Sequence, residues 1–64
     1  MDREYRRLYV RDGNGIIWDE IICWNAEKAY MGQWVGQGKI SRISKKAWDR
    51  AEKIEGYEDE GRKE

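Results

Sequence analysis

The sequence contains no histidine, phenylalanine or proline, and it has one cysteine, Cys23, among 64 residues. Histidine is the commonest general base and the commonest metal ligand, so its absence removes the usual parts of both kinds of site. A single cysteine excludes an internal disulfide and, without histidine, a zinc site. We therefore expect no enzyme activity, no metal, no cofactor and no small-molecule substrate.

The chain also lacks any long apolar run and an apolar segment near its N-terminus. These absences argue against a membrane span and a signal peptide, and an unpaired cysteine fits a reducing compartment, so we expect a cytoplasmic protein. A chain this short buries a small core and is marginally stable unless packing, a partner or self-association supports it. We expect one compact domain over 1–57 and a disordered acidic tail over 58–64.

Aromatic residues stand out among those present, because the sequence holds four tryptophans and four tyrosines. Trp and Tyr combine a large apolar body with a polar tip and are enriched where protein surfaces hold partners. This composition therefore favours a binding surface over a reaction centre.

The formal charge is zero, but charge is distributed in blocks along the sequence. The net charge is +2 over 1–11, −3 over 12–38, +4 over 39–53 and −3 over 54–64. A folded chain with this pattern can show a basic and an acidic surface, which indicates a charged partner without fixing its sign.

Alternating residues predict a strand over 5–11, and the Asp-Gly-Asn-Gly turn at 12–15 predicts a hairpin of type I′ to a second strand over 16–24. Asp19-Glu20 interrupts that second strand and can mark a bulge. The residues Asn25 to Val35 favour a helix over 26–35, although three nearby glycines weaken it; the alternative is a glycine-rich strand over 31–43.

Lys39 to Ile43 predicts a short strand, and Ser44 is suited to cap a helix over 45–55 that ends before Gly56. We place Trp48 on the apolar stripe of that helix, with Ala47, Ala51 and Ile54. The resulting fold class is α+β, in the order β-β-α-β-α, with a three-stranded antiparallel sheet. The alternative is a small all-β, barrel-like sheet followed by a C-terminal helix.

Three patterns that resemble catalytic or ligand sites have simpler explanations. Asp19 and Glu20 are neighbours on a strand and point to opposite faces, so they cannot act as a carboxylate pair. Cys23 has no histidine to activate it, so we expect it to pack in the core. Gly32, Gly36 and Gly38 lack the lysine of a phosphate-binding loop, and we assign them to turns or bulges.

The partner-binding residues we predict are aromatic and arginine side chains of the N-terminal half and the following segment: Tyr5, Arg7, Tyr9, Arg11, Trp18, Trp24 and Trp34. This prediction fails if Trp18, Trp24 and Trp34 all prove to be buried. The alternative is a nucleic-acid surface on the basic segment 39–53, formed by Lys39, Arg42, Lys45, Lys46, Arg50 and Lys53.

In general style the chain is similar to small accessory proteins of bacteriophages and mobile elements, being short, aromatic-rich and charged in blocks. No defined motif carries this resemblance. It implies a non-enzymatic inhibitor or modulator that blocks a host protein by occupancy. We therefore expect a protein-binding module, with a homodimer as one way to cover its aromatic residues, and nucleic-acid binding as the alternative function.

Overall fold

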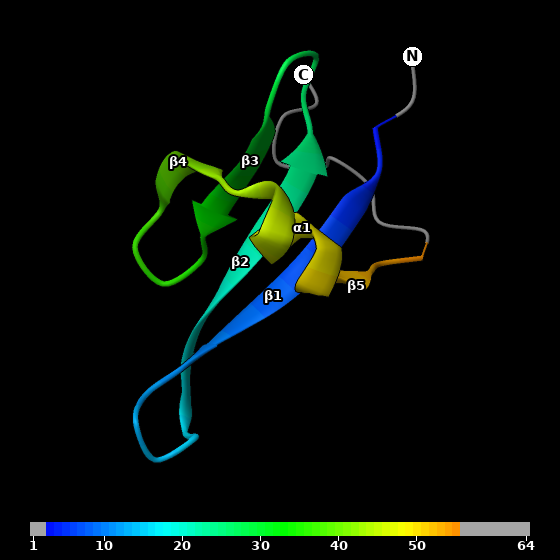
Figure 1. The fold of residues 1–64 in the computed structure, drawn as a ribbon. Helices are drawn as coiled ribbons and strands as arrows, with labels where there is room; N and C mark the ends of the chain where they lie inside the picture. Colours follow the sequence, from blue (N-terminus) through cyan, green and yellow to red (C-terminus); the bar gives the residue numbers. More distant parts are fainter. Residues whose placement is uncertain (1–2, 56–64) are drawn as a thin grey trace.

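A computed structural model describes residues 3–55, which form a single antiparallel sheet crossed by one short helix (Figure 1). The elements are β1 (Tyr5–Arg11), β2 (Ile17–Asn25), β3 (Tyr30–Trp34), β4 (Lys39–Ile43), α1 (Lys45–Arg50) and β5 (Glu52–Lys53). The strand order across the sheet is β4-β3-β2-β1-β5. The first four strands form a meander, and α1 carries the chain across one face so that β5 pairs at the opposite edge.

This architecture contradicts the predicted fold class, because the described part of the chain is mostly strand, with five strands and one helix. The β-β-α-β-α order is wrong at its first helix and at the number of strands. The alternative with a C-terminal helix is also wrong in its ending, since β5 follows α1 and pairs with β1. The predicted tail over 58–64 and the cap at Gly56 lie outside the described residues.

The β1–β2 hairpin confirms the strand predicted over 5–11 and the turn at 12–15, but the turn is not of type I′. Only Gly15 in this turn has a positive φ, of 83°. The Asp12 carboxylate organises the rest by accepting hydrogen bonds from the backbone N–H groups of Asn14 (2.8 Å) and Ile16 (2.9 Å). A type I′ turn requires positive φ at both of its central residues, whereas this turn has one positive φ and is held together by the Asp12 side chain.

The helix predicted over 26–35 is a turn followed by β3. Tyr30 and Trp34 are four residues apart, which suits a helix, but they also share one face of a strand. β3 lies between two strands and pairs on one side with β2 and on the other with β4. Those two ladders of backbone hydrogen bonds outweigh the helix propensity of the Ala-Glu-Lys-Ala segment.

The helix predicted over 45–55 begins where expected and ends early. Ser44 is its N-cap, and its side chain accepts a hydrogen bond from the Ala47 N–H at 3.0 Å. After Arg50 the chain becomes extended at Ala51, and Glu52 and Lys53 pair with Arg7 and Arg6 of β1. The pairing with a distant strand ends the helix, because no helix-breaking residue stands at this position.

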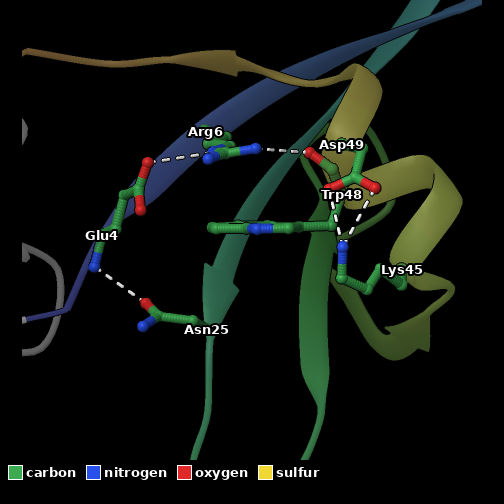
Figure 2. A network of polar contacts seen from close by, with 6 residues as sticks. All are labelled: Glu4, Arg6, Asn25, Lys45, Trp48 and Asp49. Carbon is green, nitrogen blue, oxygen red and sulfur yellow. Dashed lines mark hydrogen bonds and ion pairs between the residues drawn. The ribbon is translucent and has the colours of Figure 1, made fainter.

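Trp48 holds α1 against the sheet. Its side chain is 5% exposed and stacks on Tyr30, with ring centroids 5.0 Å apart. Arg6 covers the other side of the ring at 4.2 Å and donates a hydrogen bond to the Trp48 carbonyl at 2.8 Å, as Figure 2 shows. Arg6 also pairs with Glu4, whose N–H donates to the Asn25 side chain, so this network joins β1, β2 and α1.

The sheet therefore has two faces with different surroundings. The face that α1 crosses, the helix face, carries the core: Leu8, Val10, Ile21, Cys23, Tyr30, Trp34, Ile43, Trp48 and Ala51. The strand register places the alternate residues on the opposite face, the far face: Tyr5, Arg7, Tyr9, Ile22, Trp24, Met31, Gln33 and Arg42.

Candidate functional site

The predicted partner-binding residues fall into two groups that lie on different parts of the sheet. Four of them share the far face of β1 and β2, as cross-strand partners or neighbours: Tyr5, Arg7, Tyr9 and Trp24. Tyr5 and Trp24 are buried, with ring centroids 6.4 Å apart, and the Arg3 guanidinium lies 5.9 Å from the Trp24 ring. These two aromatic residues therefore support the fold and are not open to a partner.

The remaining residues of β1 in this set are more accessible. Tyr9 is 38% exposed, and Arg11 is exposed beside the hairpin turn. Arg7 is half-buried, with its Nε 3.3 Å from Glu20 Oε1. Arg11 Nη1 donates a hydrogen bond to the Gly15 carbonyl at 3.1 Å. Both arginines are thus held in place by one contact and keep further N–H donors on the guanidinium.

Trp18 and Trp34 form the second group, on the neighbouring strands β2 and β3. Their ring centroids are 6.1 Å apart. Trp18 is 56% exposed, whereas Trp34 is half-buried at the margin of the core. Trp18 is therefore exposed although Trp24, on the same strand, is buried.

A bulge explains why Trp18 joins Trp34. Val10 pairs with Asp19 and Arg11 pairs with Ile17, so Trp18 is an extra residue on β2. The interruption expected at Asp19-Glu20 thus occurs one residue earlier. An extra residue breaks the alternation of faces, which brings Trp18 away from Trp24 and toward the helix-face side of the sheet.

The surface around Trp18 contains further exposed apolar side chains. Ile16 and Ile17 are 60% and 45% exposed, and Val35 is 50% exposed. Val35 is tied to this region because its N–H donates to the Glu20 carbonyl at 2.9 Å. We call this surface the apolar end, and it consists of Ile16, Ile17, Trp18, Trp34 and Val35. Within this end, Ile17 stands opposite Arg11 and Trp18 lies beside Trp34. Large exposed apolar patches are characteristic of protein interaction sites.

The Asp19 side chain holds the turn that follows Val35 of the apolar end against β2. Asp19 is 9% exposed, and its Oδ1 accepts hydrogen bonds from the backbone N–H groups of Gly36 (2.8 Å) and Glu20 (2.7 Å). A Cβ at position 36 would lie 3.0 Å from Asp19 Oδ1, so the glycine allows the carboxylate to approach the backbone. The 35–38 turn is therefore anchored to β2 beside Trp18.

We expect this anchor to be lost in acid. The Gly36 N–H is the main reason that the pKa of Asp19 lies below its ordinary value of 3.8; burial opposes the shift, and Glu20 and Gln37 support it. A carboxyl group with a lowered pKa in the folded state stabilises the fold above its unfolded pKa, and this contribution disappears as the pH falls through the folded value. Asp19→Asn should therefore lower the melting temperature at pH 6 and do so progressively less toward pH 2.

Thermal unfolding followed by circular dichroism at several pH values measures this difference. Asp49→Asn is the matched control, because the Asp49 carboxylate is exposed on α1 and contacts exposed Lys45. A melting-temperature deficit of Asp19→Asn that stays constant between pH 6 and pH 2 would show that the charge of Asp19 is not what anchors the turn.

Cys23 lies in the centre of the core and is fully buried, as the sequence predicts. Burial raises the pKa of its thiol to about 11, and nearby Arg6 opposes this shift only in part. Its Sγ lies 3.7 Å from the Ile21 carbonyl. A buried, protonated thiol is a packing group and not a nucleophile.

The six basic residues of the alternative site do not lie on one surface. Lys45, Lys46 and Arg50 are exposed on α1, but Lys39 and Lys53 lie on strands at opposite edges of the sheet. Arg42 stands opposite Met31 and belongs to the far face. Trp48, the aromatic residue within this segment, is buried under Arg6 and cannot stack on a base.

Comparison with protein-family models, with curated proteins and with solved structures gave no match to this chain. Within residues 3–55, no group of three or more His, Cys, Asp or Glu side chains is placed to hold a metal ion. The one helix of that region, α1, has six residues and is too short to cross a membrane.

Sequence reasoning missed Ile16, Ile17 and Val35 as site residues. Ile16 and Ile17 directly follow the Asn-Gly pair of the hairpin turn. Side chains at the tip of a long hairpin extend past the neighbouring strands, so their position beside the turn was a signal of exposure. Val35 carried no such signal, because its position depends on the turn that Asp19 anchors.

Proposed function

We propose that this chain is a small protein-binding module that acts by occupying the surface of a protein partner through its apolar end. The observation that carries this proposal is the exposure of three successive apolar residues, Ile16, Ile17 and Trp18, where β2 begins after the hairpin turn. Trp is enriched among the residues that dominate binding energy, and apolar neighbours exclude water from such an anchor.

The energetics of a small domain support this assignment. Burying one Ile or similar apolar side chain contributes about 1.5–3 kcal/mol, which is a large fraction of the stability of a domain this size. The chain nevertheless leaves two isoleucines and one tryptophan of the same hairpin in water. A partner that covers these side chains gains the free energy that folding alone does not use.

The mode of action we propose is occupancy. In this proposal the chain is encoded by a phage or a mobile element and acts as an inhibitor or modulator of a cytoplasmic host protein. Self-association through the same apolar end is the homodimer alternative. Sedimentation velocity separates the two, because a dimer that covers Trp18 sediments as a dimer in the absence of any partner.

We expect Trp18→Ser to abolish partner capture while the domain remains folded. Trp18 makes one aromatic contact, with Trp34, so its loss should cost about 1 kcal/mol of stability. As a central binding residue its loss should cost about 2 kcal/mol of affinity, which is roughly 30-fold. Tagged protein is used to capture partners from a lysate of the source organism after nuclease treatment.

Lys28→Ser is the matched control, because Lys28 is also exposed and lies in the turn between β2 and β3 at the other end of β2. The proposal predicts that the same protein is retained by wild type and by Lys28→Ser and is lost with Trp18→Ser. Loss of all bound material on nuclease treatment would instead identify a nucleic-acid-binding protein and contradict the proposal.

A further inference from the structure

The outer edge of β1 is only partly covered by β5. β1 runs from Tyr5 to Arg11, but β5 consists of Glu52 and Lys53 and pairs only with Arg7 and Arg6. β2 occupies the other side of β1 along its length. Beyond Arg7, no strand of residues 3–55 pairs with the outer edge of β1.

The backbone groups of this open stretch point outward. Ile54 N–H donates to the Tyr5 carbonyl at 3.0 Å, so the backbone groups of Tyr5 are directed toward β5 and away from β2. Alternate residues of an antiparallel strand direct their N–H and C=O groups to the same side. Tyr9 and Arg11 therefore present theirs at the open edge, where an added strand can pair with them.

A hollow of about 180 Å³ lies at this edge, and its lining is basic. Three arginines, one from α1 and two from β1, line it with one acid and two less polar residues: Arg7, Leu8, Tyr9, Arg11, Arg50 and Glu52. The contacts of Arg7 with Glu20 and of Arg11 with Gly15 each use one nitrogen of a guanidinium group. Guanidinium groups bind carboxylates through paired N–H donors, so this lining suits an acidic ligand.

We propose that this edge binds an extended, acidic peptide segment of a partner protein, which adds to β1 as a strand in line with β5. The main chain of the peptide pairs with Tyr9 and Arg11, and its carboxylates contact Arg7, Arg11 and Arg50. The inference rests on the proposed function in taking a protein as the ligand, but it uses the outer edge of β1, which borders the apolar end where Arg11 pairs with Ile17.

Two other occupants fit the edge less well. A second copy of the chain pairing edge to edge would bring arginines of both copies together, which is unfavourable. A nucleic acid backbone supplies phosphate oxygens that accept from arginine, but it has no row of N–H donors with the spacing of a strand to pair with the Tyr9 and Arg11 carbonyls. A peptide satisfies both the backbone and the charges.

The test is a titration of ¹⁵N-labelled full-length protein with an acetylated, amidated peptide in which Glu alternates with Thr and Val. The proposal predicts shifts of the Tyr9 and Arg11 amide signals and slower hydrogen exchange at both. The same peptide with Lys in place of Glu should cause neither change. Absence of shifts with the Glu peptide, or equal shifts with the Lys peptide, would overturn the proposal.

Two charge-reversal variants on α1 sharpen the test. Arg50→Glu should weaken binding of the Glu peptide about tenfold, because it replaces an attractive charge with a repulsive one. Lys46→Glu makes the same charge change on the same helix away from the hollow and should leave affinity within about twofold. Equal weakening by both variants would mean that general charge, not this edge, attracts the peptide.

Further outcomes identify the other occupants and separate this proposal from the proposed function. Shifts at Tyr9 and Arg11 that depend on protein concentration alone would identify a second copy as the occupant. Displacement of the Glu peptide from these amides by a single-stranded oligonucleotide would identify nucleic acid. Either result overturns the proposal.

The Trp18→Ser variant should bind the peptide as wild type does. A failed titration beside intact, Trp18-dependent partner capture would therefore contradict only the edge site.

Discussion

Replacing Trp48 with alanine is expected to abolish cooperative folding of this domain. Trp48 is 5% exposed, stacks on Tyr30 and lies under Arg6, and no other side chain of α1 is buried. Truncating a buried Trp costs about 3–5 kcal/mol, which equals the stability that a core of this size supplies. Loss of this contact also frees α1, and with α1 the link that returns the chain to β5.

Circular dichroism and amide proton dispersion measure this result, with Trp18→Ala as the matched control. Trp18 is 56% exposed, so its truncation should lower stability by about 1 kcal/mol and leave a cooperative transition. If the Trp48→Ala variant melts cooperatively within a few degrees of wild type, Trp48 is not the side chain that holds α1 against the sheet.

A methyl group added at Gly32 is expected to destabilise the domain by about 1–3 kcal/mol, the usual range for overpacking. Gly32 is buried in β3, and a Cβ there would lie 2.5 Å from Ile21 Cγ2 and 3.2 Å from Ile43 Cγ2. Because Ile is branched at Cβ, its Cγ2 is restricted in rotation and cannot swing aside. Gly32→Ala therefore forces a shift of Ile21 in β2 and of Ile43 in β4.

A double-mutant cycle identifies the cause of this loss. Ile21→Leu removes the branch at Cβ, so Gly32→Ala should be less destabilising in the Ile21→Leu background than in wild type. Gly13→Ala is the control, because a Cβ at position 13 meets no atom within 4 Å and its φ is not positive. Additive effects in chemical denaturation would show that the Gly32–Ile21 contact does not limit packing.

The sequence predicts elements well where local patterns suffice. Residues 5–11 alternate and precede an Asp-Gly-Asn-Gly turn, and the structure confirms that strand and its hairpin. Ser44 similarly marks the start of α1. Each of these features depends on hydrogen bonds or periodicity within a few residues of the chain.

Elements that depend on distant partners could not be predicted in the same way. β3 has a spacing of aromatic residues that fits a helix and a strand equally, and only its two neighbouring strands decide between them. β5 has two residues, too few for any pattern, and it exists because Arg6 and Arg7 lie opposite. Both errors have the same cause, since pairing across the sheet leaves no mark within the segment itself.

The same distinction applies to the candidate binding residues. Trp18 and Trp24 are an even number of residues apart on β2, which places them on one face of a regular strand. A single extra residue in the strand instead places Trp18 beside Trp34 and leaves Trp24 buried with Tyr5. The composition therefore predicted that some aromatic residues are exposed. Which of them are exposed depends on a bulge that the sequence did not locate.

Site-directed photo-crosslinking shows whether the apolar end contacts a protein partner. A photoreactive amino acid replaces Trp18 in one variant and Lys28, exposed in the turn between β2 and β3, in another, and both are irradiated in a nuclease-treated lysate of the source organism. We expect a discrete protein adduct from position 18 and none from position 28. An adduct from position 28 alone, or no protein adduct from position 18, would contradict the proposed function.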